Sequence, residues 1–318
     1  IYAGYTGYDE IAHHFGADSQ EAFRALRGLD KQIRQIDRIR QVYVQRAYDL
    51  FILSDHGMTP SVSFRHAYGQ TLQQLISEHT EGAVLARGDQ EATEGLSAAR
   101  MRFVVDELRA AEARPHRPDS ARLLSAMRLK LEQQLAPDAL GEDWDLSRRE
   151  EIVVKSSGSL SHIYFNVTAR IMDLSEIAFL YPGILKALAG HEGIQMVVGR
   201  EENEILIIGH SGTLWVGPDG RTVEGKDPLA GLDDPDWALA QITRLARFPH
   251  AGDLVLLGHW DGDGVICFEE QVASHGGLGG PQDWPFILYP PYERLSARGI
   301  QNAEELYVRF RKAYGEYS

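Results

Sequence analysis

Three short segments, far apart in the chain, carry the kinds of side chain that bind divalent metal ions. They are Asp9-Glu10-Ile11-Ala12-His13, Ser54-Asp55-His56-Gly57 and Ser274-His275-Gly276-Gly277. Together they offer the carboxylates of Asp9 and Asp55 and the imidazoles of His13, His56 and His275. Such a mixed oxygen and nitrogen set suits zinc or manganese better than calcium or magnesium. A chain that uses all three segments must fold so that they meet, and this requirement constrains its fold most strongly.

The spacing within the first segment selects one of two adjacent histidines. On a helix, Asp9 and His13 are about 40° apart around the axis, whereas His14 is about 140° from Asp9. We therefore expect His13 to share a helix face with Asp9, and His14 to lie at the surface or behind the site.

The pattern around the second segment favours an α/β fold. Apolar residues recur every three or four positions over residues 19–45, which predicts an amphipathic helix. Residues 48–53 then form an apolar run of strand length that leads directly into Asp55 and His56. Open α/β sheets place their sites just beyond the carboxyl ends of strands. We expect an α/β fold with a mainly parallel sheet and flanking helices.

Further elements are predicted along the rest of the chain. Helices are expected at residues 70–79, 174–189 and 302–314, and strands at 152–155, 162–167, 196–199, 204–208 and 213–216. Residues 253–257 and 265–269 are expected to form a strand pair around a glycine-rich turn.

Residues 81–150 differ in composition from the rest of the domain. They are rich in Ala, Arg, Glu, Leu and Gln, and two prolines interrupt the helical pattern. We expect a helical insertion or cap within one domain that spans residues 1–318. A peripheral helical hairpin with no role at the site is the alternative.

The amino-acid composition restricts the kinds of molecule that the chain can bind. The net charge of −14 argues against binding a nucleic-acid polymer, whose affinity comes mainly from Lys and Arg. A small anion remains compatible as a ligand, because two divalent ions add four positive charges at one point.

Cys267 is the only cysteine, so an intrachain disulfide is excluded. No apolar run approaches the length of a membrane span. We expect a soluble domain without membrane contact, and the sequence indicates no compartment.

The metal-binding segments also resemble those of a known superfamily. The resemblance covers most of the chain and is strongest in four stretches. These are Gly7-Tyr8-Asp9-Glu10-Ile11-Ala12-His13-His14, Leu53-Ser54-Asp55-His56-Gly57, Ser157-Gly158-Ser159-Leu160, and Phe268-Glu269-Glu270 running on to Ser274-His275-Gly276-Gly277-Leu278-Gly279-Gly280. They resemble the alkaline phosphatase superfamily, most closely its type I phosphodiesterase and nucleotide pyrophosphatase branch. An alkaline phosphatase-like fold is therefore implied.

This resemblance implies two metal ions in one cleft. The first would be held by Asp9, His13 and His275, and the second by Asp55 and His56. Zinc is the expected metal, with manganese as the alternative. The family's second site also uses an Asp and a Thr or Ser nucleophile from a strand that precedes the first motif.

That early strand has no counterpart in this sequence, because only eight residues precede Asp9. Thr6 is a poor substitute, since it lies three residues before Asp9 rather than on a separate strand. We expect a domain truncated at its N-terminus, whose hydroxyl nucleophile lies upstream of Ile1. On its own the chain should bind about one zinc tightly and fail to hydrolyse phosphodiesters.

The implied activity is two-metal hydrolysis of a small phosphate ester, of the phosphodiesterase or nucleotide pyrophosphatase kind. Two alternatives stay open: a phosphotransferase or phosphomutase of the same superfamily, and a non-catalytic metal-binding fragment. Relatives of this type carry membrane helices upstream, so the resemblance leaves a membrane-anchored parent protein open. His162, in a Ser-Leu-Ser-His-Ile-Tyr strand pattern, is a candidate to face the substrate, although a structural role is favoured.

Overall fold

The structure is a computed structural model of the 318-residue chain. It describes residues 1–42, 47–80, 84–85, 152–168, 170–290 and 295–315. The chain divides into two units, Ile1–Val84 with Ile152–Ser318, and Leu85–Glu151. The expected helical insertion at residues 81–150 falls almost wholly outside the described residues, so it stays a prediction.

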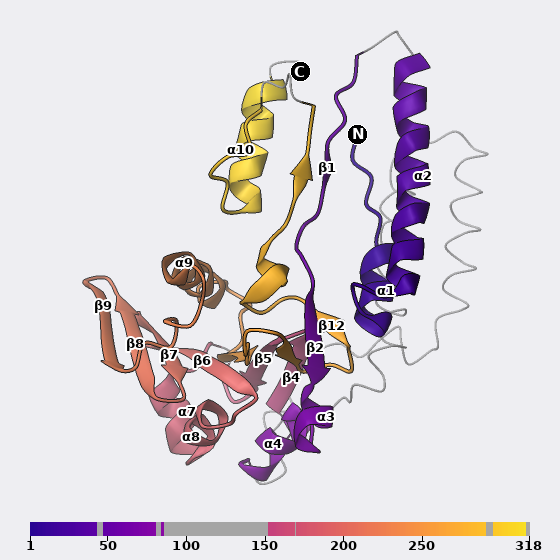
Figure 1. Ribbon diagram of the computed structural model, residues 1–318. Coiled ribbons are helices and arrows are strands. Elements are labelled where there is room, and N and C mark those ends of the chain that lie inside the picture. The colour runs from indigo at the N-terminus through magenta and orange to yellow at the C-terminus, as the bar shows by residue number, and fades with distance from the viewer. Residues whose placement is uncertain (43–46, 81–83, 86–151, 169, 291–294, 316–318) are drawn as a thin grey trace, which may run out of the picture. The chain divides into compact units, whose positions relative to one another are not determined.

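Helices and strands alternate irregularly along the described chain (Figure 1). The helices are α1 (Gly7–Phe15), α2 (Gln20–Val42), α3 (Phe64–Tyr68), α4 (Leu72–Glu78), α7 (Leu174–Leu180), α8 (Ile184–Ala189), α9 (Pro235–Ala246), α10 (Ala303–Tyr314) and the short 3-10 helix η2 (Gly280–Asp283). The strands are β1 (Ile52–Leu53), β2 (Thr59–Ser63), β3 (Val84–Leu85), β4 (Ile152–Ser157), β5 (Leu160–Phe165), β6 (Ile194–Glu201), β7 (Glu204–Gly209), β8 (Gly212–Gly217), β9 (Gly220–Gly225), β10 (Leu254–Gly258), β11 (Val265–Cys267), β12 (Ala273–Ser274) and β13 (Ile287–Leu288).

The largest sheet has eight strands in the order β3-β4-β5-β10-β6-β7-β8-β9. The α/β class is confirmed, but the expectation of a mainly parallel sheet is corrected. The pairs from β4 to β9 are antiparallel, and the parallel ladder among the described strands is β2 with β11. The short connections between successive strands explain the antiparallel arrangement. Two-residue turns join β4 to β5, β6 to β7, β7 to β8 and β8 to β9, and such turns can only reverse the chain.

Alternate residues of the central strands enter two separate cores. Leu254 and Leu256 of β10 pack into the core that contains α7 and α8, whereas Val255 and Leu257 pack into the core that contains α9. Strands β6 and β7 divide their side chains in the same way. Since successive side chains of a strand point to opposite faces, helices cover both faces of this sheet. The uninterrupted apolar sequence of β10 is explained by its place between β5 and β6.

Two small sheets carry the segments that contain the candidate ligands. One has the order β11-β2-β12, and the other pairs β1 with β13. The strand expected at residues 48–53 is present only as Ile52–Leu53. It leads toward His56, while β2 leads away from it.

Most other element predictions are confirmed with changed boundaries. Helix α2 covers most of residues 19–45, and α4 and α10 lie where helices were expected. The helix expected at 174–189 is divided at Gly183, whose φ of 89° lies outside the helical region. The strand pair expected at 253–269 is present only next to its turn, where Trp260 and Val265 form an antiparallel bridge, because β10 and β11 themselves belong to different sheets. Helix α9 was not predicted, although Asp234 followed by Pro235 is a helix start signal.

The described helices were compared with the length and apolar character that a membrane-spanning helix needs. None of them combines enough residues with enough apolar character to cross a bilayer.

The hydrogen bonds of the Asp253 side chain can be tested for their contribution to stability. Its side chain is 6% exposed, and its two oxygens accept hydrogen bonds from the backbone N–H groups of Phe165 (2.7 Å) and Met172 (2.8 Å). Asn offers one acceptor oxygen and a donor, so Asp253→Asn should leave one buried N–H without a partner. We expect the free energy of unfolding to fall by about 1–3 kcal/mol, measured by urea denaturation. The exposed turn variant Asp219→Asn makes the same charge change and should be neutral. Equal denaturation midpoints for the two variants would contradict this assignment.

Candidate functional site

Helix α1 presents Asp9 and His13 on one face, as their spacing predicted. The Nε2 atom of His13 lies 3.5 Å from Oδ2 of Asp9, and His14 is exposed. The Nδ1 atom of His13 lies 2.8 Å from the carbonyl oxygen of Ala273. A carbonyl can only accept, so Nδ1 carries the proton and donates it. In addition, the N–H of Val272 donates to the carbonyl of His13 at 2.9 Å. The end of α1 is thereby attached to the segment that leads into β12.

The pairing of β2 with β12 brings the other two histidines together. The antiparallel register places Pro60 opposite Ala273 and Thr59 opposite Ser274. His56 lies just before β2 and His275 just after β12, so both emerge at the same end of this pair. Their rings stack, with centroids 3.5 Å apart and an interplanar angle of 18°. The Nδ1 atom of His56 donates to the carbonyl of Gly57 at 2.8 Å, which leaves its Nε2 atom for another partner.

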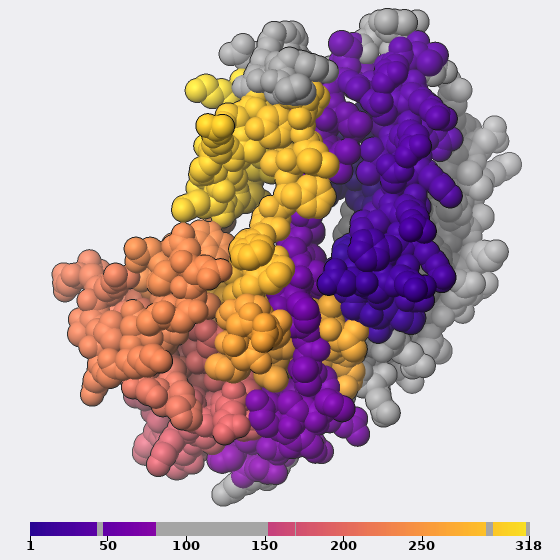
Figure 2. Space-filling view, in the orientation of Figure 1, coloured from indigo at the N-terminus to yellow at the C-terminus, as the bar shows by residue number. Residues whose placement is uncertain are grey.

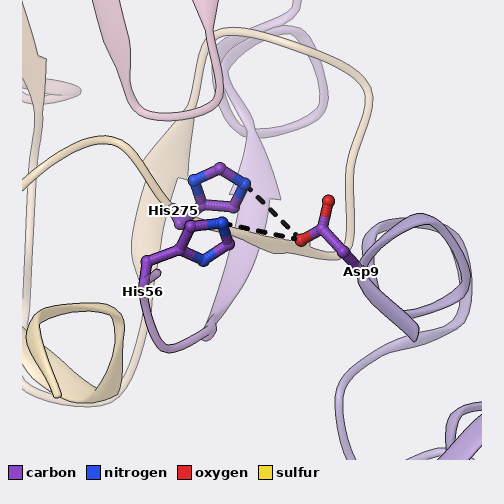
Figure 3. Close-up of side chains that lie close together, drawn as sticks. All are labelled: Asp9, His56 and His275. Atoms are coloured by element: carbon purple, nitrogen blue, oxygen red, sulfur yellow. Dashed lines mark ion pairs between the residues drawn. The ribbon is translucent and has the colours of Figure 1, made fainter. Parts of the chain in front are cut away.

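The carboxylate of Asp9 faces the rings of both His56 and His275 (Figure 3). Its Oδ1 atom is 3.6 Å from Nε2 of His275 and 4.0 Å from Nε2 of His56. One ligand atom from each of these three residues lies within 4.8 Å of the others. Oδ1 is inaccessible to solvent and has no hydrogen-bond partner. A buried carboxylate oxygen without a donor is costly, and a bound cation would remove that cost.

The electrostatics of the site agree with an ionised carboxylate among partly buried imidazoles. Burial would raise the pKa of Asp9, but the contact with His13 and the charges of His13, His275 and His56 bring it below its usual value. Burial would lower the pKa of His13, but Asp9, Ala273 and Glu269 raise it. Burial and the neighbouring His56 lower the pKa of His275 to about 4. His275 is therefore neutral at pH 7, the form that binds metals.

The donor atoms fit a metal ion of the zinc type. Around a tetrahedral zinc with bonds of about 2.0–2.1 Å, neighbouring donors are about 3.3–3.4 Å apart. The separations of 3.6 and 4.0 Å from Oδ1 of Asp9 exceed this by about 0.2–0.7 Å. Metal-binding histidines also commonly donate their second ring N–H to a backbone carbonyl, as His13 and His56 do here. Asp9, His56 and His275 could thus hold one ion and leave a coordination position open.

The structure groups the expected ligands differently from the two sets anticipated from sequence. His56 joins Asp9 and His275, whereas His13 contacts the other oxygen of Asp9. The side chain of Asp55 is 90% exposed, and its Oδ1 atom lies 3.6 Å from Nε2 of His56. All the expected ligands therefore lie in one neighbourhood, with Asp9 and His56 at its centre.

His162 lies on β5, and its ring has a hydrogen-bond partner away from the candidate site. Its Nδ1 atom accepts a hydrogen bond from the N–H of Gly252 at 2.9 Å, and the ring stacks near Tyr164. Burial and the charge of Arg200 lower the pKa of His162. These contacts are those of a histidine that links two backbone segments.

Gly158 and Glu269 were not given roles by sequence reasoning, although both lie in the stretches that carry the resemblance. Gly158 has a φ of 62°, and a Cβ atom there would lie 2.0 Å from the carbonyl oxygen of His275. Its N–H donates to the carboxylate of Glu269, whose charge also contributes to the raised pKa of His13. This glycine therefore permits the turn between β4 and β5 to lie against the His275 backbone.

Comparison with known proteins identifies the family to which the chain belongs. The family model for type I phosphodiesterase / nucleotide pyrophosphatase matches residues 1–159, half of the 318-residue chain. The matched part contains Asp9, His13, Asp55 and His56, and His275 lies beyond it. Neither the curated proteins nor the solved structures give a match. The match supports phosphoric ester hydrolysis at the level of the family. By its motifs and by this match, the chain belongs to the type I phosphodiesterase / nucleotide pyrophosphatase family.

Proposed function

We propose that this chain carries the metal centre of an enzyme that hydrolyses small phosphate esters. The observation that carries the proposal is the buried, unpartnered Oδ1 atom of Asp9, which faces Nε2 of both His56 and His275. Asp9, His56 and His275 would hold one zinc ion. The resemblance implies a second ion held by Asp55 and His56, and Oδ1 of Asp55 lies 3.6 Å from Nε2 of His56.

The proposed chemistry requires positive charge at one point of an acidic protein. When bound, divalent ions would neutralise charge on the phosphoryl group and help an attacking oxygen to lose its proton. The residues themselves bind and orient these ions, and the neutral His275 supplies its lone pair without competition from a proton at pH 7. With a net charge of −14, the chain would attract small anions only near such a centre.

Three nucleophilic side chains close in sequence to the ligands are buried and engaged in other contacts or protonated. Ser274 is fully buried and its hydroxyl donates to the carbonyl of His275. Thr59 is also buried, and its hydroxyl accepts from the N–H of Gln282. Burial raises the pKa of Cys267 to about 12, so its thiol stays protonated. These three groups are therefore unsuited to attack phosphorus, and we assign to the described site residues the binding and orientation of the phosphoryl group.

Zinc titration tests the metal centre. His275→Ala removes a direct ligand, so zinc affinity should fall by at least about 100-fold, more than the 10-fold to 100-fold typical of outer contacts. The affinity is measured by calorimetry and the bound metal by elemental analysis. His162→Ala is the matched control, because it removes a partly buried histidine that has its own backbone partner. Unchanged zinc affinity in His275→Ala, or an equal loss in the control, would contradict the assignment.

Phosphate binding tests the substrate class. The metal-free site presents the carboxylates of Asp9 and Asp55, which repel anions, whereas the zinc-loaded site should attract them. We expect inorganic phosphate and a nucleoside monophosphate to bind at least about tenfold more tightly to the zinc-loaded chain, measured by calorimetry. A single-stranded oligonucleotide should not bind under the same salt conditions. Phosphate affinity that is independent of zinc would count against a phosphate ester substrate.

A further inference from the structure

Gln282 lies where the segment after His275 meets the segment after His56. It belongs to η2, and its side chain is 4% exposed. In Figure 2 the orange surface formed by residues near 270–285 lies against the purple surface of β2. A buried glutamine must satisfy both the acceptor and the donor atoms of its amide, so its partners define what it holds together.

The side-chain amide of Gln282 binds the glycine-rich segment that follows His275. Its Oε1 atom accepts from the N–H of Gly277 at 3.1 Å and from the hydroxyl of Ser159 at 3.4 Å. Its Nε2 atom donates to the carbonyl of Gly279 at 2.8 Å. Rotating the amide by 180° would set a donor against the N–H of Gly277, so the hydrogen bonds fix one orientation. The amide thereby fixes the path of the chain directly after His275.

The main chain of Gln282 binds the segment that follows His56. Its N–H donates to the hydroxyl of Thr59 at 2.9 Å, and its carbonyl accepts from the N–H of Gly57 at 3.0 Å. The approach at Gly57 is very close, since a Cβ atom there would lie 1.8 Å from the carbonyl oxygen of Pro281. One residue is therefore bonded to the backbone on both sides of the stacked His56 and His275 rings.

We propose that Gln282 is a positioning residue that sets the separation of His56 and His275, and through it the affinity of the site for metal. This inference rests on the proposed function, because it assigns both histidines to the metal. Gln282 does not touch the ring nitrogens that face Asp9. It acts through Gly57 on one side and through Gly277 and Gly279 on the other.

The experiment compares two buried glutamines. Gln282→Met keeps the length of the side chain but removes the amide donor and acceptor. Gln73→Met is the matched control, because Gln73 is also 4% exposed and its Oε1 atom has no hydrogen-bond partner. Gln282→Met should lower zinc affinity by about 10-fold to 100-fold and change the visible absorption of the cobalt(II) form. Gln73→Met should leave the affinity within about twofold of the unmodified chain. Equal zinc affinity and equal cobalt spectra in the two variants would overturn the proposal.

A second pair of variants applies if Gln282→Met does not fold. Thr59→Val keeps the shape of the buried side chain but removes the acceptor for the N–H of Gln282, whereas Thr59→Ser retains it. Zinc affinity should fall in Thr59→Val and be restored in Thr59→Ser. Equal affinities in the Val and Ser variants would contradict the positioning role.

A metal-free measurement separates this inference from the proposed function. The imidazole nitrogen resonances of His56 and His275 in the metal-free chain report the stacking of the two rings. They should shift in Gln282→Met and stay unchanged in Gln73→Met. If the unmodified chain binds no zinc but these resonances shift, the metal proposal fails and the positioning role stands. If zinc binds and the resonances do not shift, the positioning role fails.

Discussion

The candidate site depends on a short antiparallel pairing between β2 and β12. This pairing sets Thr59 opposite Ser274, and it thereby joins the segment that contains His56 to the segment that contains His275. The same region of chain binds α1, because the ring of His13 bonds to the carbonyl of Ala273 and the carbonyl of His13 accepts from the N–H of Val272, just before β12. All three ligand segments are therefore held to one strand of two residues. A strand this short has few hydrogen bonds of its own, so the contacts around it, including those of Gln282, contribute to holding its position.

The carboxylate of Asp9 distinguishes the candidate metal site from an ordinary polar cluster. Its Oδ2 atom faces His13, and its Oδ1 atom is buried without a hydrogen-bond donor. An unsatisfied buried polar atom costs about 1–3 kcal/mol, and more when the group is charged. The imidazole nitrogens of His56 and His275 face the same atom, and the pKa of His275, at about 4, keeps that ring neutral. Two ring nitrogens and one ionised oxygen leave a place for a cation.

The large sheet supports the site without supplying its ligands. Strands β4 to β8 and β10 contribute to two apolar cores, one on each face, and these cores contain most of the buried apolar residues of the described fold. The turn between β4 and β5 connects this part to the site, since Gly158 allows the close approach of the His275 backbone. Ser159 adds a bond to the side chain of Gln282. The backbone of His275, which follows directly after β12, thus also lies against the large sheet through this glycine turn.

Local sequence determined the features that depend on near neighbours. The spacing of Asp9 and His13 is enough to place both on one face of α1, because a helix repeats every 3.6 residues. The strand at residues 253–257 was also predicted from its own short apolar sequence. Two-residue turns also connect most of the strands from β4 to β9, and turns this short make neighbouring strands antiparallel. The expectation of a mainly parallel sheet did not take these turns into account.

Only the tertiary structure decided how distant segments combine. Strand β2 is polar and short, so no periodic pattern revealed that it pairs with β12. That pairing, and not the order of motifs, placed His56 with Asp9 and His275. The role of Gln282 also followed from contacts with residues far away in the chain. Hydrogen bonds between distant segments depend on the whole fold, whereas the sequence around each residue specifies only which groups are available to form them.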